Sequence, residues 1–362
     1  MRRSYLRTLG TAILLFTISA ADKTNAMQYQ ERSSDEASTL STQAAAAVDS
    51  HHYSEAVDLL ERAVALSPDN AQTRYKLGRV LQDQERFVES IATFRQALRL
   101  DPNFSDAELA LGVSYNRVGL YDEAIDSFKR AAKLNPTRAE SFSELTFSYY
   151  MTGRYQEAVE YGKEAIRLGP DLSIAYNNLA IAYFKSGEHE AAIEAFEHAI
   201  KLEPNCAEFY NNLGYTYADL GRFKEAMAFY QAAIQRKPDY AAALNNLGTA
   251  FCDLGQYRSA IEPLERAIKS RANTPEAHYN LGYVLSKTGH KKEAIQSYKN
   301  AIMLKPDFAQ AYTNLAVLYL QMGQRELALQ QYTILKSLNR ELAEKLFNLI
   351  YKDKILRVNA NN

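Results

Sequence analysis

The residue types that most often catalyse reactions or bind metals are sparse in this sequence and lie far apart. His189 and Glu190 begin an H-E-x-x-H zinc motif, but Ile193 stands where the second histidine is required. His51 and His52 form an isolated pair, which is more typical of an exposed turn than of a metal site. The sequence has neither a glycine-rich phosphate loop nor a G-x-S-x-G motif. We therefore expect no catalytic site, no metal and no cofactor.

Five asparagines have a spacing that suits the binding of a polypeptide. They recur every 34 residues: Asn178, Asn212, Asn246, Asn280 and Asn314. A primary amide both donates and accepts hydrogen bonds, so it matches a peptide backbone of any sequence. Tyr215, Thr249 and Tyr283 each follow one of these asparagines by three residues and are candidates to pack on ligand side chains. Two alternatives remain open: the asparagines are copied by repeat duplication, and the three flanking residues are ordinary core or surface positions.

The 34-residue period extends through most of the chain and defines the elements that position these side chains. Prolines mark it at Pro68, Pro102, Pro136, Pro170, Pro204, Pro238 and Pro306. When proline is given position 32, leucine recurs at position 7, a small residue at position 8, alanine at positions 20 and 27, and a large residue at position 24. The asparagine row falls at position 6. This spacing predicts two amphipathic helices in each unit, which approach closely where their side chains are small.

Residues at the expected helix ends follow the same period. Glycine occupies position 15 in seven units, where a left-handed residue would end the first helix. Polar residues at position 33, such as Asp69 and Asn103, are predicted to cap the next first helix. Cys206 and Cys252 are predicted to lie in non-adjacent layers, too far apart for a disulfide, whose Cα atoms must lie within about 7 Å.

The length and pattern of the unit resemble the tetratricopeptide repeat family. The resemblance implies an all-α, right-handed superhelical solenoid in which the first helices line a concave groove. It covers nine repeats: 37–70, 71–104, 105–138, 139–172, 173–206, 207–240, 241–274, 275–308 and 309–342. The asparagine row resembles the asparagine ladder in the repeat domain of O-linked N-acetylglucosamine transferases, which holds extended polypeptide. Repeat one, with Gln43 at position 7, is expected to be an end cap, and repeat four, with Thr146 and Gly162, a soft spot.

The two ends of the chain depart from the period. Residues 1–26 have a basic start followed by the apolar stretch from Leu9 to Ser19, which predicts a signal peptide cleaved after Ala21 or Ala26. The string RRSYLR also resembles a twin-arginine export signal. Residues 27–36 are expected to be a flexible segment. A capping helix is predicted at 340–352, since Leu342, Leu346 and Ile350 share one face, and residues 353–362 form a tail.

These observations favour a non-catalytic, extracytoplasmic scaffold or adaptor that binds an extended peptide segment of a protein partner. The 42 basic and 43 acidic residues balance, so nucleic acid is not an expected partner. The apolar stretch is too short for a stable membrane span, which needs about 20 residues. One alternative is a structural subunit of an envelope assembly for secretion, pili or polysaccharide export. A glycosyltransferase is less favoured, because only 20 residues follow residue 342. The sequence does not indicate an oligomeric state.

Overall fold

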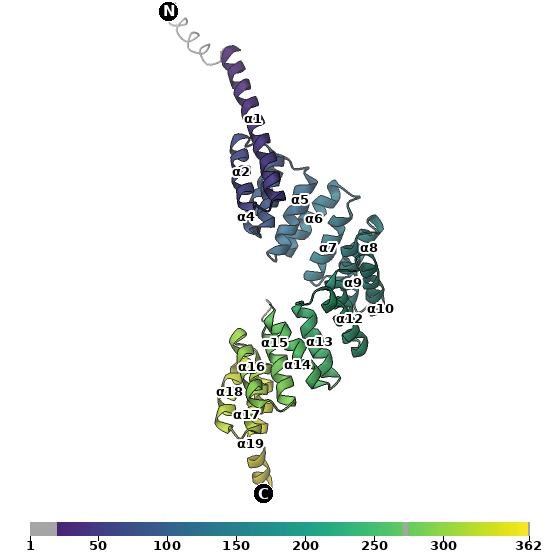
Figure 1. The fold of residues 1–362 in the computed structure, drawn as a ribbon, viewed down its shortest axis with the longest axis vertical. Coiled ribbons are helices and arrows are strands. Elements are labelled where there is room, and N and C mark those ends of the chain that lie inside the picture. Colours follow the sequence, from purple (N-terminus) through teal and green to yellow (C-terminus); the bar gives the residue numbers. More distant parts are fainter. Residues whose placement is uncertain (1–19, 271–273, 361–362) are drawn as a thin grey trace, which may run out of the picture. The chain divides into compact units, whose positions relative to one another are not determined.

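The computed structural model describes residues 20–270 and 274–360, and within those ranges the chain forms nineteen helices and no strand. Contacts divide the chain into two compact units, residues 1–170 (unit 1) and 171–362 (unit 2). In each unit consecutive helices lie side by side as antiparallel pairs (Figure 1). The predicted fold class, an all-α solenoid of helix pairs, is confirmed.

Unit 1 contains four pairs, in which the odd-numbered helix is the first of its repeat. They are α1 (Ala20–Asp49), α2 (Tyr53–Leu66), α3 (Ala71–Asp83), α4 (Phe87–Leu100), α5 (Ser105–Arg117), α6 (Tyr121–Leu134), α7 (Ala139–Met151) and α8 (Tyr155–Leu168). Each helix packs on the next one along the chain.

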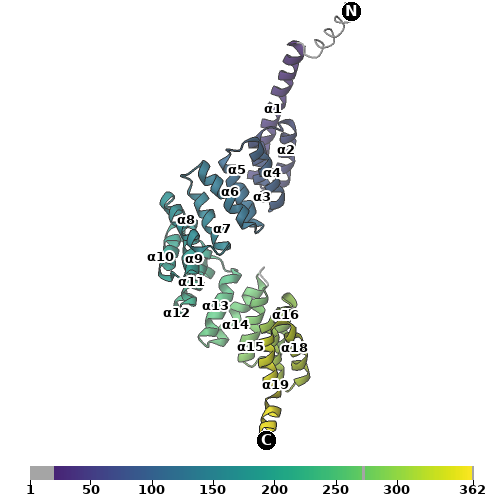
Figure 2. The same ribbon diagram turned by 180° about the vertical axis from the view of Figure 1, so that it is seen from behind.

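Unit 2 contains five pairs and one added helix. They are α9 (Ser173–Ser186), α10 (His189–Leu202), α11 (Ala207–Asp219), α12 (Phe223–Arg236), α13 (Ala241–Asp253), α14 (Tyr257–Lys269), α15 (Pro275–Lys287), α16 (Lys291–Leu304), α17 (Ala309–Gln321), α18 (Arg325–Leu338) and α19 (Arg340–Ala360). The same helices can be followed from the opposite side in Figure 2.

In every repeat except repeat four, a small residue at position 8 faces a large residue at position 24 of the same pair. A Cβ added to Gly78 would lie 2.5 Å from the Phe94 ring, and one added to Gly214 would lie 2.8 Å from the Tyr230 ring. These distances are far shorter than van der Waals contact, so the two helices of a pair can approach this closely only where the side chain is absent. Phe94 and Tyr230 are fully buried as a result.

The turn inside each repeat requires a left-handed residue at position 15. All seven glycines at this position have positive φ, between 70° and 90°. Repeats one and two place His51 and Glu85 there instead, each at φ 60°. L-residues with a side chain adopt this conformation at a cost of about 1–2 kcal/mol.

The predicted helix caps at position 33 were wrong by one residue. The residue before each first helix is at position 34, and its side chain accepts a capping hydrogen bond at Asn70, from the Thr73 amide, and at Thr274, from the Ala277 amide. The position-33 residues lie in the preceding turn, where a backbone hydrogen bond such as Asn70 N–H to Ser67 O closes the chain reversal. Asn and Asp are favoured in turns as well as at helix caps, so their presence at position 33 did not distinguish a turn residue from a cap.

Helix α1 begins earlier than the repeat period indicates. Residues 27–36, which we expected to be flexible, are helical and belong to α1. Their composition of Gln, Glu, Arg, Ser and Asp permits a helix without an apolar face, and Glu31 and Arg32 are exposed. The later part of α1 packs on α2 through Ala37, Leu40 and Ala44, in agreement with a capping role for repeat one.

Helix α19 covers the last repeat, as predicted. It packs on α17 and α18 and buries Ala343, Leu346 and Ile350, while Leu342 packs at the edge of this cluster. The helix continues to Ala360, so most of the expected tail is helical.

Repeat four lacks the large residue at position 24 and contains a pair of stacked tyrosines. Tyr149 is buried and stacks on Tyr161 with 5.1 Å between ring centroids. The Arg154 guanidinium lies over the Tyr149 ring at 4.4 Å from the centroid. The large buried ring of this repeat is therefore Tyr149 at position 11, whereas position 24 is Gly162.

Candidate functional site

The first helices of unit 2 form one continuous layer. Helices α9, α11, α13, α15 and α17 each contact the next first helix, in addition to the second helix of their own repeat. The second helices of this unit make no such series of contacts with one another across the described residues. Within unit 2 the stack must therefore curve toward its first helices. All five position-6 asparagines lie in this layer.

Hydrogen bonds connect the asparagines into a ladder across the layer. The Nδ2 of Asn212 donates to Asn177 Oδ1 at 3.1 Å, and the Nδ2 of Asn246 donates to Asn211 Oδ1 at 3.0 Å. In the next two repeats Asn280 donates to Asn245 Oδ1 at 3.1 Å, and Asn314 donates to the Tyr279 hydroxyl at 3.0 Å. Each of these four position-6 amides thus binds the position-5 side chain of the preceding first helix.

The position-5 partners were not identified from the sequence. Asn177, Asn211 and Asn245 immediately precede a position-6 asparagine, so an Asn-Asn doublet at the same repeat position was the available signal. Asn177 is 1% exposed and Asn211 is 8% exposed, whereas Asn212 and Asn246 are part-buried. Asn178, the first member of the row, is 8% exposed. The layer therefore buries Asn177 and Asn211, whereas Asn245 and four of the five position-6 amides are part-buried.

The three flanking candidates differ in their surroundings. Tyr215 is 48% exposed, and its ring meets Phe184 edge to face at 5.5 Å. Thr249 is tied into the ladder, since its hydroxyl donates to Asn245 O at 3.0 Å and accepts from Asn280 Nδ2 at 3.2 Å. Tyr283 is part-buried and packs edge-on to Tyr257. Tyr215 is the most accessible of the three.

The residues considered for catalysis or metal binding are not assembled into a site. Among the residues that the structure describes, no group of three metal-ligating side chains occurs. His189 packs edge-on against Phe184 at 5.5 Å, as expected for a residue in an aromatic position, and His51 and His52 are exposed. Cys206 and Cys252 are free thiols, and burial raises the pKa of Cys252 to about 11, so its nucleophilic thiolate is disfavoured.

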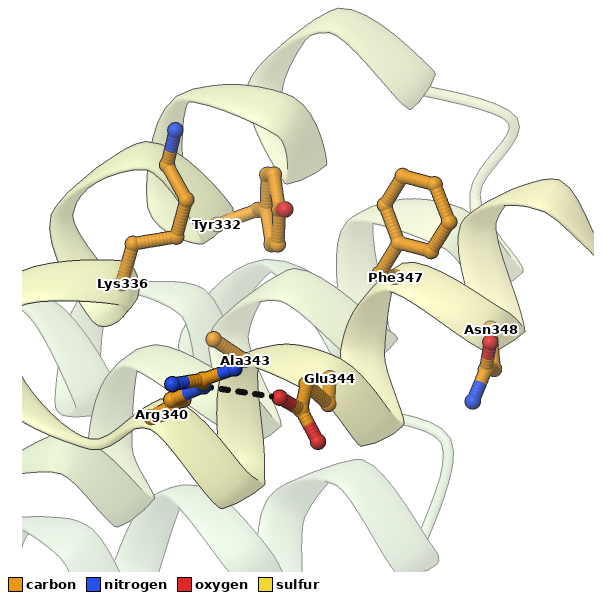
Figure 3. A pocket seen from close by; sticks show the side chains of 7 residues that line it. All are labelled: Tyr332, Lys336, Arg340, Ala343, Glu344, Phe347 and Asn348. Carbon is orange, nitrogen blue, oxygen red and sulfur yellow. Dashed lines mark hydrogen bonds and ion pairs between the residues drawn. The ribbon is translucent and has the colours of Figure 1, made fainter.

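A pocket of about 480 Å³ lies between α18 and α19, separate from the asparagine ladder (Figure 3). It is lined by Tyr332, Lys336, Arg340, Ala343, Glu344, Phe347 and Asn348. The Arg340 guanidinium binds Glu344 at 3.0 Å, so part of its charge is already neutralised. The Tyr332 and Phe347 rings pack together with 5.8 Å between centroids.

The chain belongs to the tetratricopeptide repeat family. Sequence profiles described as "Tetratricopeptide repeat" match residues 42–103, 75–139, 109–173, 177–241 and 309–341, and one described as "TPR repeat" matches 248–289 and 292–323. Such repeats build protein-interaction scaffolds, and this is the class of molecule that the fold and the ladder define. No curated protein sequence matches the chain.

Solved structures similar to this chain include two with the following scores. The crystal structure of the APC/C hetero-tetramer Cut9-Hcn1 superimposes with a TM-score of 0.58 at 21% identity, over 82% of this chain and 58% of that chain. The structure of YrrB, a TPR protein with an unusual peptide-binding site, gives a TM-score of 0.41 at 22% identity, over 51% of this chain and 95% of the other. Among the described residues, no helix is both long and apolar enough to cross a bilayer.

Proposed function

We propose that the first-helix layer of unit 2 binds an extended segment of a partner protein, without catalysis. The observation that supports this most strongly is the ladder itself. Asn212, Asn246 and Asn280 occupy the same position on three successive first helices. Each is held in orientation by a hydrogen bond to the preceding first helix. The result is a row of partly open amides at a regular interval.

The ladder uses only part of the hydrogen-bonding capacity of these amides. A primary amide has two N–H donors and an oxygen with two lone pairs. In Asn280 the Nδ2 donates to both Asn245 and Thr249. In Asn212 and Asn246 the bond to position 5 uses only one N–H. The remaining donor and acceptor match the carbonyl and amide groups of a peptide backbone. Because the side chain is already fixed by its neighbour, binding a ligand costs it little further conformational entropy.

Exposed apolar side chains on the same layer provide contact area for ligand side chains. Tyr215 is 48% exposed, and Ile174, at position 2 of α9, is 42% exposed. Large apolar and aromatic residues that are left open on a helix layer are typical of binding surfaces. A ligand held by backbone contacts to the amides would have its side chains beside these residues.

The proposal can be tested with two double variants that delete the same two ladder bonds. Asn212→Ala with Asn246→Ala removes the partly open amides, and Asn177→Ala with Asn211→Ala removes their buried partners. A peptide selected from a random library on the wild-type chain would then be measured by fluorescence anisotropy. We expect the position-6 pair to weaken binding by roughly 5- to 150-fold, about 0.5–1.5 kcal/mol for each lost bond. The position-5 pair should weaken binding less, because it keeps the position-6 amides and removes only the bonds that orient them. Equal loss in both variants would contradict direct contact.

We also propose that the chain works outside the cytoplasm. The support is the sequence pattern at the N-terminus, a basic start followed by the apolar stretch from Leu9 to Ser19. Residues 1–19 lie outside the part of the chain that the structure describes. N-terminal sequencing of the protein from its source cell should begin at Asp22 or Met27. An unprocessed start at Met1 in the cytoplasmic fraction would contradict the proposal.

A further inference from the structure

One acidic side chain occupies the ladder position in unit 1. Glu144 lies at position 6 of repeat four, on α7, where the repeats of unit 2 carry asparagine. The position-5 residue of the preceding repeat is Leu109, which offers no polar partner. Glu144 Oε2 instead accepts a hydrogen bond from Asn116 Nδ2 at 3.3 Å, and Asn116 Oδ1 accepts from Ser148 Oγ at 2.9 Å.

The charge of Glu144 is only weakly compensated. Burial raises the pKa of this carboxyl group, and the Asn116 hydrogen bond and the charge of Arg117 only partly oppose that shift. Among the residues that the structure describes, no lysine or arginine forms an ion pair with it, whereas the nearby Glu140 is paired with Arg138. A part-buried carboxylate with one long hydrogen bond from a neutral amide is an incomplete arrangement, which a cation would complete.

A series of aromatic rings lies beside the part of α7 that follows Glu144. Phe147, one helical turn after Glu144, lies 6.4 Å from the ring of Tyr121 in α6 and 6.4 Å from that of Tyr150. Tyr150 in turn lies 6.3 Å from Tyr155, at the start of α8. All four rings are part-buried, so each retains some open surface. Aromatic faces attract organic cations, and the attraction adds to that of a carboxylate nearby.

We propose that Glu144, with the rings of Phe147 and Tyr150, binds a lysine or arginine side chain of a partner protein. We name this surface the Glu144 face. It goes beyond the asparagine ladder, because it lies in unit 1 and recognises a side-chain charge instead of a backbone. A metal ion is a poorer match, since no group of three metal-ligating side chains occurs among the described residues and the adjacent groups are aromatic. A lysine or arginine side chain brings the positive charge that the carboxylate attracts and also packs well on aromatic rings.

The experiment uses an array of random-sequence peptides probed with the full-length chain, the Glu144→Gln variant and the control variant Glu140→Gln. Glutamine keeps the shape of the glutamate and removes its charge, and circular dichroism would confirm that all three proteins are folded. Peptides bound by the wild type should be enriched in lysine and arginine. For such a peptide, Glu144→Gln should weaken binding roughly tenfold or more, because a charge-assisted hydrogen bond is lost. Glu140→Gln should leave binding unchanged.

Two results would overturn the proposal: the absence of basic enrichment among the bound peptides, or the same affinity for a basic peptide in Glu144→Gln as in the wild type. The Asn212→Ala, Asn246→Ala variant separates this proposal from the ladder proposal. If the Glu144 face acts as described, the preference for basic residues survives in that variant. If the Asn212→Ala, Asn246→Ala variant bound peptides as tightly as the wild type, the ladder proposal would fail, but the expected loss of basic-peptide binding in Glu144→Gln would be unaffected.

Discussion

At several repeat positions the structural role of a residue could be predicted from its type alone. The glycines at position 15 and the small residues at position 8 have one role each, set by backbone conformation and by close packing. The asparagine row was different, because a periodic pattern identifies the face of a helix but not the partner of a side chain. The bond from Asn212 to Asn177 spans 35 residues and depends on how adjacent repeats stack.

Glu85 provides a residue-scale prediction on stability. It occupies position 15 with φ 60°, a conformation that glycine adopts without a steric penalty. Glu85→Gly should therefore stabilise the protein by about 1 kcal/mol in urea-induced unfolding. Glu85→Ala keeps the Cβ and should bring no such gain. If the two variants have the same stability, the turn is not strained.

The ladder gives a second residue-scale prediction. The position-5 and position-6 double variants described above remove the same two hydrogen bonds, so both should lower the free energy of unfolding by roughly 1–3 kcal/mol. Alanine is the better helix former and would otherwise stabilise an exposed helix position. A rise in melting temperature for the position-6 pair would show that its cross-helix bonds contribute nothing.

Glu144 gives a prediction on pH dependence. Burial raises the pKa of its carboxyl group in the folded protein above the ordinary value of 4.5, so the ionised form is less favourable folded than unfolded. Its contribution to stability is therefore present at low pH and is lost as pH rises through the folded-state pKa. Glu144→Gln should be at least as stable as the wild type at pH 7, with the difference closing toward pH 4. A variant that is less stable at pH 7 would contradict this.

At the scale of elements, the ends of the solenoid were the hardest part to predict. The spacing of Leu346 and Ile350 correctly indicated a capping helix, because an exposed last repeat requires cover for its apolar face. The repeat period carries no information beyond residue 342, so neither the extension of α19 to Ala360 nor the early start of α1 could be read from it. Outside the repeats, only helix propensity could indicate where α1 begins and α19 ends, and propensity is a weak predictor.

The capping role of α19 can be measured with two leucines of that helix. Leu346 is 2% exposed and Leu349 is 46% exposed. Leu346→Ala should destabilise the last repeat by about 2–5 kcal/mol, since it removes buried methyl groups and leaves a cavity. Leu349→Ala should change stability by less than about 0.5 kcal/mol. Amide hydrogen exchange in α17 and α18 would measure the stability of the last repeat in each variant. Equal protection in the two variants would exclude a capping role.

At the scale of the whole molecule, the fold could be predicted because each repeat packs mainly on its neighbours in sequence. A local period therefore specifies the architecture, without knowledge of distant contacts. The binding surface could not be predicted from the period in the same way. It depends on which polar groups remain open after the repeats have stacked, as with the partly open Asn212 beside the buried Asn211.

The central claim, that the first-helix layer of unit 2 holds a partner segment, is tested most directly by photo-crosslinking. Tyr215→p-benzoylphenylalanine places the crosslinker on that layer, and Met303→p-benzoylphenylalanine places it on the second helix α16, where Met303 is 73% exposed. With a peptide selected on the wild-type chain, we expect a covalent adduct at position 215 and none at position 303. An adduct at position 303 alone would contradict the account.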